Sequence, residues 1–160
     1  MTTQITNETL LGISFLKGLN DAELTQLAKL CHAHSYATGE ICQTEGQPTK
    51  RINLIIKGRV GVVMHIPNIT YCSSEIIMDT FRDGEVFGWS ALLQGAPWST
   101  LRVLEPTEVL YINVDDVLGL CDNCSHIGYV LMKNLSWLIA SRFRRNRMSI
   151  LNAIVAIRGE

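Results

Sequence analysis

The segment between Gly84 and Thr100 constrains the fold more than any other part of this 160-residue chain. Residues 84–88 (Gly-Glu-Val-Phe-Gly) read as the end of a strand and a glycine turn, and residues 89–93 (Trp-Ser-Ala-Leu-Leu) as the start of a short helix. Pro97 then marks a break before a new strand. A helix that starts after a glycine turn presents free backbone N–H groups and a positive dipole end. The segment therefore predicts a site that favours an anion, set between two strands.

The residues on either side of this segment have the composition of β-strands. β-Branched runs occupy residues 52–56 and 60–64, and Lys57-Gly58-Arg59 between them predicts a turn. Residues 71–78 and 107–114 have the same character. Five glycines stand where corners are expected, and each can adopt a positive φ: Gly39, Gly46, Gly58, Gly84 and Gly88. Several short strands joined by glycine turns favour a sandwich or a barrel.

Helical patterns flank the strands. Asn20 predicts the N-cap of a helix with leucines at positions 24, 27 and 30. A short helix is expected from Asp115 to Cys121, and a long one from Ser125 to about Ile157, where the chain has no proline. The long helix carries a broad apolar stripe: Leu131, Leu135, Leu138, Ile139, Phe143, Ile150, Leu151 and Ile154. A single small sandwich cannot cover such a stripe along its full length.

The segment 84–100 and the register of the glycines together resemble the cyclic-nucleotide-binding domain family, which includes the effector domains of the cAMP receptor protein and Fnr. The resemblance covers roughly residues 10 to 155. It implies a mainly β fold with flanking helices: a double-stranded β-helix jelly roll at about 32–114 and C-terminal helices at about 115–157, in one domain spanning 1–160. The family's transcription factors append a helix-turn-helix domain. The chain stops at Glu160, so we expect no such domain and no direct DNA binding.

In this family, residues 84–100 would form the phosphate-binding cassette. A Glu there holds the ribose 2′-hydroxyl and an Arg holds the cyclic phosphate, but Trp89 and Trp98 stand at those two positions. Losing both charged hydrogen bonds costs roughly 3–6 kcal/mol, or about two to four decades of affinity. Ordinary cyclic AMP binding is therefore not expected. The resemblance implies ligand contacts from these cassette positions: Phe87, Gly88, Trp89, Ser90, Ala91, Trp98, Ser99 and Thr100.

Three functions remain open. The first is a non-catalytic regulatory domain whose aromatic pocket senses a small, flat or apolar effector. The second is a dimeric interaction module in which both indoles fill the pocket as core and the domain holds a protein partner. The third is a metal-dependent cupin-type enzyme, because cupins are jelly rolls and His32-Ala33-His34 precedes Glu40 and Gly46, although this spacing fits the cupin motif poorly. We expect no catalytic residues, no cofactor and no metal.

The resemblance also implies a homodimer, because the family's long helix forms the dimer seam and closes over the effector pocket. It assigns that seam to Leu131, Leu135, Leu138 and Phe143. A basic cluster follows on the same helix: Arg142, Arg144, Arg145 and Arg147. We interpret this cluster as a solvated helix end with salt bridges across the dimer, and an anionic partner is the alternative.

Composition limits the remaining classes. The net charge of −1 gives no general reason to expect nucleic acid, and no apolar run approaches the length of a membrane span. The N-terminus has no basic leader, and the odd number of cysteines, five, indicates reduced thiols. We therefore expect a cytoplasmic location, no membrane contact and cysteines that serve packing. The lone Cys121–Cys124 pair supports a zinc site only weakly.

Overall fold

Three short helices open the chain in the computed structural model, which describes residues 5–65 and 75–158. They are α1 (Asn7–Leu11), the 3₁₀ helix η1 (Ser14–Leu16) and α2 (Asp21–Ala28). The α2 helix begins at the predicted cap, where the Asn20 side chain accepts a hydrogen bond from the Glu23 N–H at 3.0 Å. Glu23 in turn accepts from the Asn20 N–H at 2.9 Å. This reciprocal capping box satisfies two backbone donors at the helix start.

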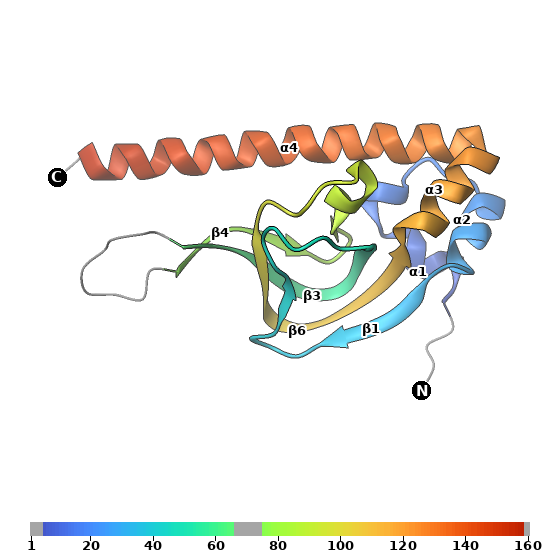
Figure 1. Ribbon diagram of the computed structural model, residues 1–160, viewed down its shortest axis with the longest axis horizontal. Helices are drawn as coiled ribbons and strands as arrows, with labels where there is room; N and C mark the ends of the chain where they lie inside the picture. The colour runs from blue at the N-terminus through green and yellow to red at the C-terminus, as the bar shows by residue number, and fades with distance from the viewer. Residues whose placement is uncertain (1–4, 66–74, 159–160) are drawn as a thin grey trace.

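An antiparallel sheet of six strands forms the body of the domain (Figure 1). The strands are β1 (His32–Tyr36), β2 (Ile41–Gln43), β3 (Arg51–His65), β4 (Glu75–Arg82), β5 (Val86–Phe87) and β6 (Thr100–Asn113). The main order is β1-β6-β3-β4, while β2 pairs with β6 and β5 pairs with β3. The predicted class, a mainly β jelly roll with flanking helices, is confirmed. The predicted strand at 71–78 is described from Glu75 onward, and its first residues lie outside the described part of the chain.

The turn predicted at Lys57-Gly58-Arg59 is wrong, because β3 runs through it without reversing. Gly58 has a φ of +123°, and the pairing of β3 with β6 shifts register on both sides of it. A Cβ on Gly58 would collide with Thr107 and the carbonyl of Pro106. The glycine therefore allows a bulge, where the strand bends and the neighbouring backbone approaches closely.

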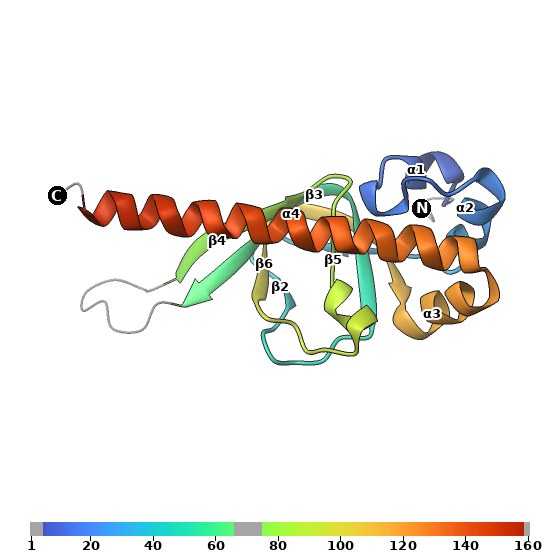
Figure 2. The ribbon, with the colours of Figure 1, turned by 90° about the horizontal axis from the view of Figure 1, so that it is seen from above.

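Two helices follow the sheet, α3 (Val114–Asn123) and α4 (Ser125–Arg158), close to the predicted ranges. Figures 1 and 2 show α4 running along the whole length of the molecule and continuing past the sheet. From above, the N-terminal helices lie on one side of α4, whereas α3 and the cassette lie on the other (Figure 2). α4 thus divides the upper surface of the domain into two flanks.

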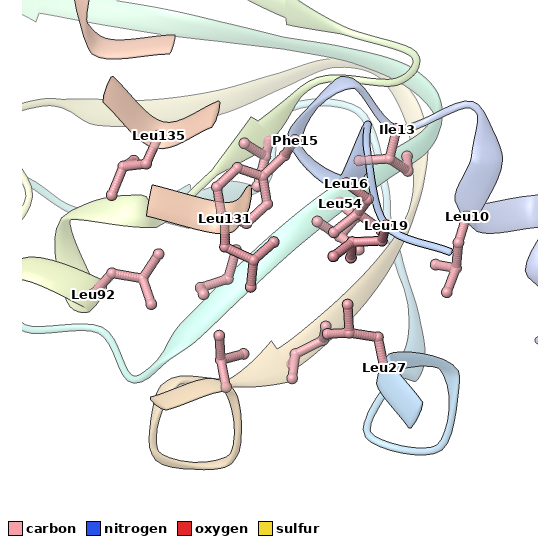
Figure 3. Packing of buried hydrophobic residues seen from close by; sticks show 14 of the residues in the cluster. Leu10, Ile13, Phe15, Leu16, Leu19, Leu27, Leu54, Leu92, Leu131 and Leu135 are labelled. Atoms are coloured by element: carbon pink, nitrogen blue, oxygen red, sulfur yellow. The ribbon is translucent and has the colours of Figure 1, made fainter. Parts of the chain in front are cut away.

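The larger hydrophobic core joins α4 to the N-terminal helices and to one end of the sheet. Figure 3 shows Leu131 and Leu135 projecting from α4 into the cluster that holds Phe15 and Leu92. Leu131, Leu135 and Leu138 are all buried within the single chain. Their predicted place in a dimer seam is therefore wrong, since their partners are residues of their own domain.

A second, smaller hydrophobic cluster lies in the sheet beside the cassette. Its buried members are Ile55, Val60, Phe81, Phe87, Leu101, Val103 and Val109. The rings of Phe81 and Phe87 lie 6.1 Å apart. This cluster gives the cassette an apolar floor that is independent of the larger core.

Candidate functional site

The cassette has the predicted order of a strand, a glycine turn and a short helix. β5 ends at Phe87, Gly88 has a φ of +80°, and the 3₁₀ helix η2 (Trp89–Leu93) begins directly after it. A Cβ on Gly88 would collide with the carbonyl of Arg51, so both the conformation and the space require glycine. Pro97 lies beyond η2 and is followed by β6. This arrangement brings the start of η2 and residues 97–99 to the same cavity.

The cavity has a volume of about 260 Å³ and lies between the cassette and α4. Most of the predicted cassette positions line it: Phe87, Gly88, Trp89, Ser90, Trp98 and Ser99. The other two do not. Ala91 is packed in the larger core, and the Thr100 hydroxyl accepts a hydrogen bond from the Glu45 N–H at 3.1 Å. The helix α4 closes the cavity with Arg142, Asn146 and Ile150.

The two indoles flank the cavity and do not fill it. Trp89 is half-buried against the larger core, whereas 78% of the Trp98 surface is exposed. Their ring centroids lie 6.1 Å apart in an edge-to-face arrangement with an interplanar angle of 88°. The interpretation that Trp98 fills the pocket as core is therefore wrong. The loop after Pro97 carries its indole at the surface, beside an open cavity.

Arg142 is the site residue that the sequence analysis placed differently. We predicted a solvated helix end, yet Arg142 is only 8% exposed. Its guanidinium donates to Asp79 Oδ2 at 2.6 Å, to the Thr80 carbonyl at 3.1 Å and to Glu85 Oε1 at 3.2 Å. It also lies over the Phe81 ring, 3.5 Å from the centroid. Residues three apart, such as Arg142 and Arg145, are neighbours on a helix surface, but only the fold shows that carboxylates face them.

The charges on the α4 side of the cavity balance one another. Burial lowers the pKa of Arg142, and the carboxylates of Asp79 and Glu85 oppose that shift. Arg145 adds an ion pair with Glu85 at 3.2 Å and a longer one with Asp79 at 3.8 Å. Two arginines of α4 thus face Asp79 of β4 and Glu85 of the turn between β4 and β5. We call Arg142, Arg145, Asp79 and Glu85 the ion-pair clamp, because together they hold α4 over the cavity.

Arg142 is the only cation that lines the cavity among residues 5–65 and 75–158. Its Nε is buried without a hydrogen-bond partner in this described region. Three of the other four N–H donors of its guanidinium serve Asp79, Thr80 and Glu85. An anion entering the cavity would have to compete with two carboxylates for this one charge.

The histidines considered for a cupin-type metal site have aromatic neighbours. His32 stacks on Tyr111 with ring centroids 5.1 Å apart, and His34 meets Tyr36 edge-on at 4.5 Å. No group of three or more potential metal ligands was found in the described part of the chain. A search of the same residues found no helix long and apolar enough to span a membrane.

Among the four cysteines in the described part of the chain, Cys31 and Cys42 have the most deeply buried thiols. Burial raises the pKa of each thiol to about 12. The Cys31 thiol donates to the Leu27 carbonyl, and the Cys42 thiol to the Leu101 carbonyl. Neutral, hydrogen-bonded thiols of this kind act as packing groups and are poor nucleophiles.

The family model of the cyclic nucleotide-binding domain matches residues 33–124, which is more than half of the chain. This match agrees with the cassette and with the cavity that α4 closes, and it shows the class to which the protein belongs. The chain belongs to the cyclic nucleotide-binding domain family. A comparison with curated protein sequences finds no match.

Solved structures agree with this fold. A cyclic nucleotide-binding domain from Methylobacillus flagellatus KT is 24% identical, with a TM-score of 0.80 over 92% of this chain and 83% of that chain. A protein from Geobacter metallireducens GS-15 is 25% identical, with a TM-score of 0.72 over 87% of this chain and 98% of that chain. The catabolite activator protein of Thermus thermophilus is 22% identical, with a TM-score of 0.68 over 86% of this chain and 61% of that chain.

Proposed function

We propose that this domain is a non-catalytic regulator whose cassette pocket senses a planar, largely apolar small molecule and does not bind cyclic AMP in the usual way. One observation carries the proposal: an open cavity of about 260 Å³ remains at the cassette, and its walls include Trp89 and Trp98. A pocket that had lost its ligand would be expected to fill with side chains, because interiors pack densely. The exposure of Trp98 favours a ligand-facing wall over a core residue.

The charge of the cavity argues against a cyclic phosphate. Its only described cation, Arg142, is bound to Asp79 and Glu85. The family's phosphate and ribose contacts correspond to the two indoles. Phe81, Phe87 and Leu101 add further apolar surface beneath them. Aromatic walls with few polar groups suit a flat ring system, which stacks on indoles and needs no counter-charge.

We also propose a homodimer on the outward face of α4. This face is defined by helical spacing and includes Tyr129, Ala140, Phe143, Arg147 and Leu151, all exposed in the single chain. Phe143 is 73% exposed, which is unusual for a ring without a partner. A second copy of α4 would cover it. This seam replaces the one first assigned to Leu131, Leu135 and Leu138.

Native mass spectrometry of freshly purified protein tests both parts, because it reports the dimer mass and any carried ligand together. Trp98→Ala should lose a ligand held in the cassette pocket. Leu11→Ala is the control, because Leu11 is also an exposed apolar side chain, at 66%, and lies outside the cassette. A carried ligand that survives Trp98→Ala unchanged would contradict the pocket assignment.

Calorimetry with cyclic AMP and cyclic GMP tests the negative part of the proposal. We expect dissociation constants above about 10 μM for the wild type. The double substitution Trp89→Glu and Trp98→Arg restores the family's polar groups and should tighten cyclic AMP binding. Wild-type binding tighter than about 10 μM would show that the indoles do not exclude the nucleotide.

A further inference from the structure

A second cavity, of about 430 Å³, lies on the opposite flank of α4 from the cassette pocket. It is formed between η1 and α4, and Figure 2 shows the N-terminal helices on the side of α4 away from the cassette. We call it the η1–α4 groove. None of the predicted ligand-contact positions of the cassette lines it, and Glu85 is the one residue of the segment 84–100 that does. Its nearest link to the cassette pocket is Arg142, which borders both spaces and separates them.

The groove has a fixed wall. The Asn134 side-chain amide of α4 donates to the Phe15 carbonyl at 2.8 Å and to the Lys17 carbonyl at 2.9 Å. These two bonds tie the end of η1 to the helix, while Phe15 is buried in the larger core. Small-molecule sites are usually preformed in this way, with rigid walls and few polar groups.

The apolar surface of the groove comes from Phe15, Trp137 and Leu138. Trp137 is the exception among them, because 71% of its surface is exposed although it adjoins a cavity. An indole in this position offers a flat face to an aromatic occupant at little cost in side-chain order.

The polar surface of the groove is predominantly cationic. Lys17 is exposed and forms no ion pair within the described residues. Arg145 donates from Nη2 to Glu85, and its Nη1 lies 3.8 Å from Asp79, but its side chain is 46% exposed, so other N–H donors stay accessible. Glu85 is the only carboxylate that lines the groove among residues 5–65 and 75–158, and Arg142 and Arg145 both hold it. The unbalanced charge of the groove is therefore positive, in contrast to the balanced cassette pocket.

We propose that the η1–α4 groove is a second ligand site, which binds a small aromatic carboxylate. The ring lies against Trp137, and the carboxylate lies between Lys17 and Arg145. Charge complementarity selects the anion, and the exposed indole beside apolar walls selects an aromatic body. The site is separate from the cassette pocket, because Arg142 lies between the two spaces and borders both.

Naphthalene-2-carboxylate is a suitable probe, and naphthalene-2-carboxamide is its uncharged counterpart. Titration of the full chain by calorimetry should give a dissociation constant of about 1 mM or tighter for the carboxylate, with at least fivefold weaker binding of the amide.

Trp137→Ala and Lys17→Met should each weaken binding of the carboxylate at least fivefold. Trp98→Ala in the cassette and Lys133→Met elsewhere on α4 are the controls, and both should leave binding unchanged. All four positions are exposed, and circular dichroism checks the fold of each variant.

Three results would overturn the proposal. Equal binding of the carboxylate and the amide would show that Lys17 and Arg145 do not contribute to binding. Loss of binding in Trp98→Ala but not in Trp137→Ala would place the probe in the cassette pocket. A raised dimer dissociation constant in Trp137→Ala and Lys17→Met, without any change in carboxylate binding, would show that a second copy of the chain covers the groove.

Discussion

The two halves of α4 have similar apolar content but different surroundings. In the first half, Leu131, Leu135 and Leu138 are buried against the N-terminal helices and the sheet. In the second half, Phe143, Met148 and Leu151 are exposed. Phe143 and Leu151 lie on the outward face of α4, and Figure 1 shows that this helix also continues past the sheet and the N-terminal helices. The change occurs at Arg142, where the ion-pair clamp makes the last buried polar contacts with the sheet edge.

This difference limits what an apolar stripe can indicate. Periodicity shows that one face of a helix prefers to be covered, but not which surface covers it. The first half of α4 is covered by its own domain, so its leucines stabilise folding. The outward face of α4, which includes Tyr129, Phe143 and Leu151, has no such cover among the described residues, so we assign it to a second copy. Substitutions on the two halves should therefore have different kinds of effect.

The largest effect is expected from Leu131→Ala in the first half of α4. Leu131 has 0% exposure, and its loss leaves a cavity in the larger core. We expect the free energy of unfolding to fall by about 3–5 kcal/mol, measured by urea denaturation. Lys133→Ala, two residues away and exposed, is the control and should change stability by less than about 0.5 kcal/mol. A similar loss in both variants would contradict the assignment of the first half to the core.

A smaller effect is expected at the boundary, from Arg142→Met. The substitution keeps an unbranched apolar side chain but removes the guanidinium, and it leaves Asp79 without its closest cation. Breaking a buried pair costs about 3–5 kcal/mol, but Arg145 and the Thr80 N–H still contact Asp79, so we expect about 2–3 kcal/mol. Arg144→Met, which removes an exposed arginine two residues along, should have little effect on the same urea transition. Equal midpoints for the two variants would show that the clamp does not stabilise the fold.

In the second half of α4, Phe143→Glu should act on association and leave folding nearly unchanged. A carboxylate in the proposed seam would be desolvated without a partner, and we expect the dimer dissociation constant to rise at least tenfold, about 1.4 kcal/mol. Analytical ultracentrifugation measures this change. Gln26→Glu adds the same charge to an exposed position on α2 and serves as the control. A wild-type chain that stays monomeric at about 100 μM would contradict the dimer.

The sequence predicted the fold class, the capped α2 helix and the order of the cassette, because each depends on local signals. Gly88 and Pro97 set the turns, and Asn20 sets the helix start. Contacts between distant residues were not predictable in the same way. The pairing of Arg142 with Asp79 spans 63 residues, and nothing local to either residue indicates the other. The bulge at Gly58 was missed for the same reason, since a glycine between two β-branched runs has the pattern of a turn.

The smallest effect is expected from Trp98→Ala, which sharpens the comparison between buried and exposed apolar residues. A buried indole lost from a core would cost about 3–5 kcal/mol, but Trp98 is 78% exposed, so we expect less than about 0.5 kcal/mol. Thermal denaturation without ligand measures this. Trp89→Ala is the counterpart, because Trp89 packs against the larger core and should cost more. If Trp98→Ala destabilised the dimer as much as Trp89→Ala, Trp98 would be buried by a second copy in solution. The pocket wall would then be a structural contact, and the interaction module would become the better account of this domain.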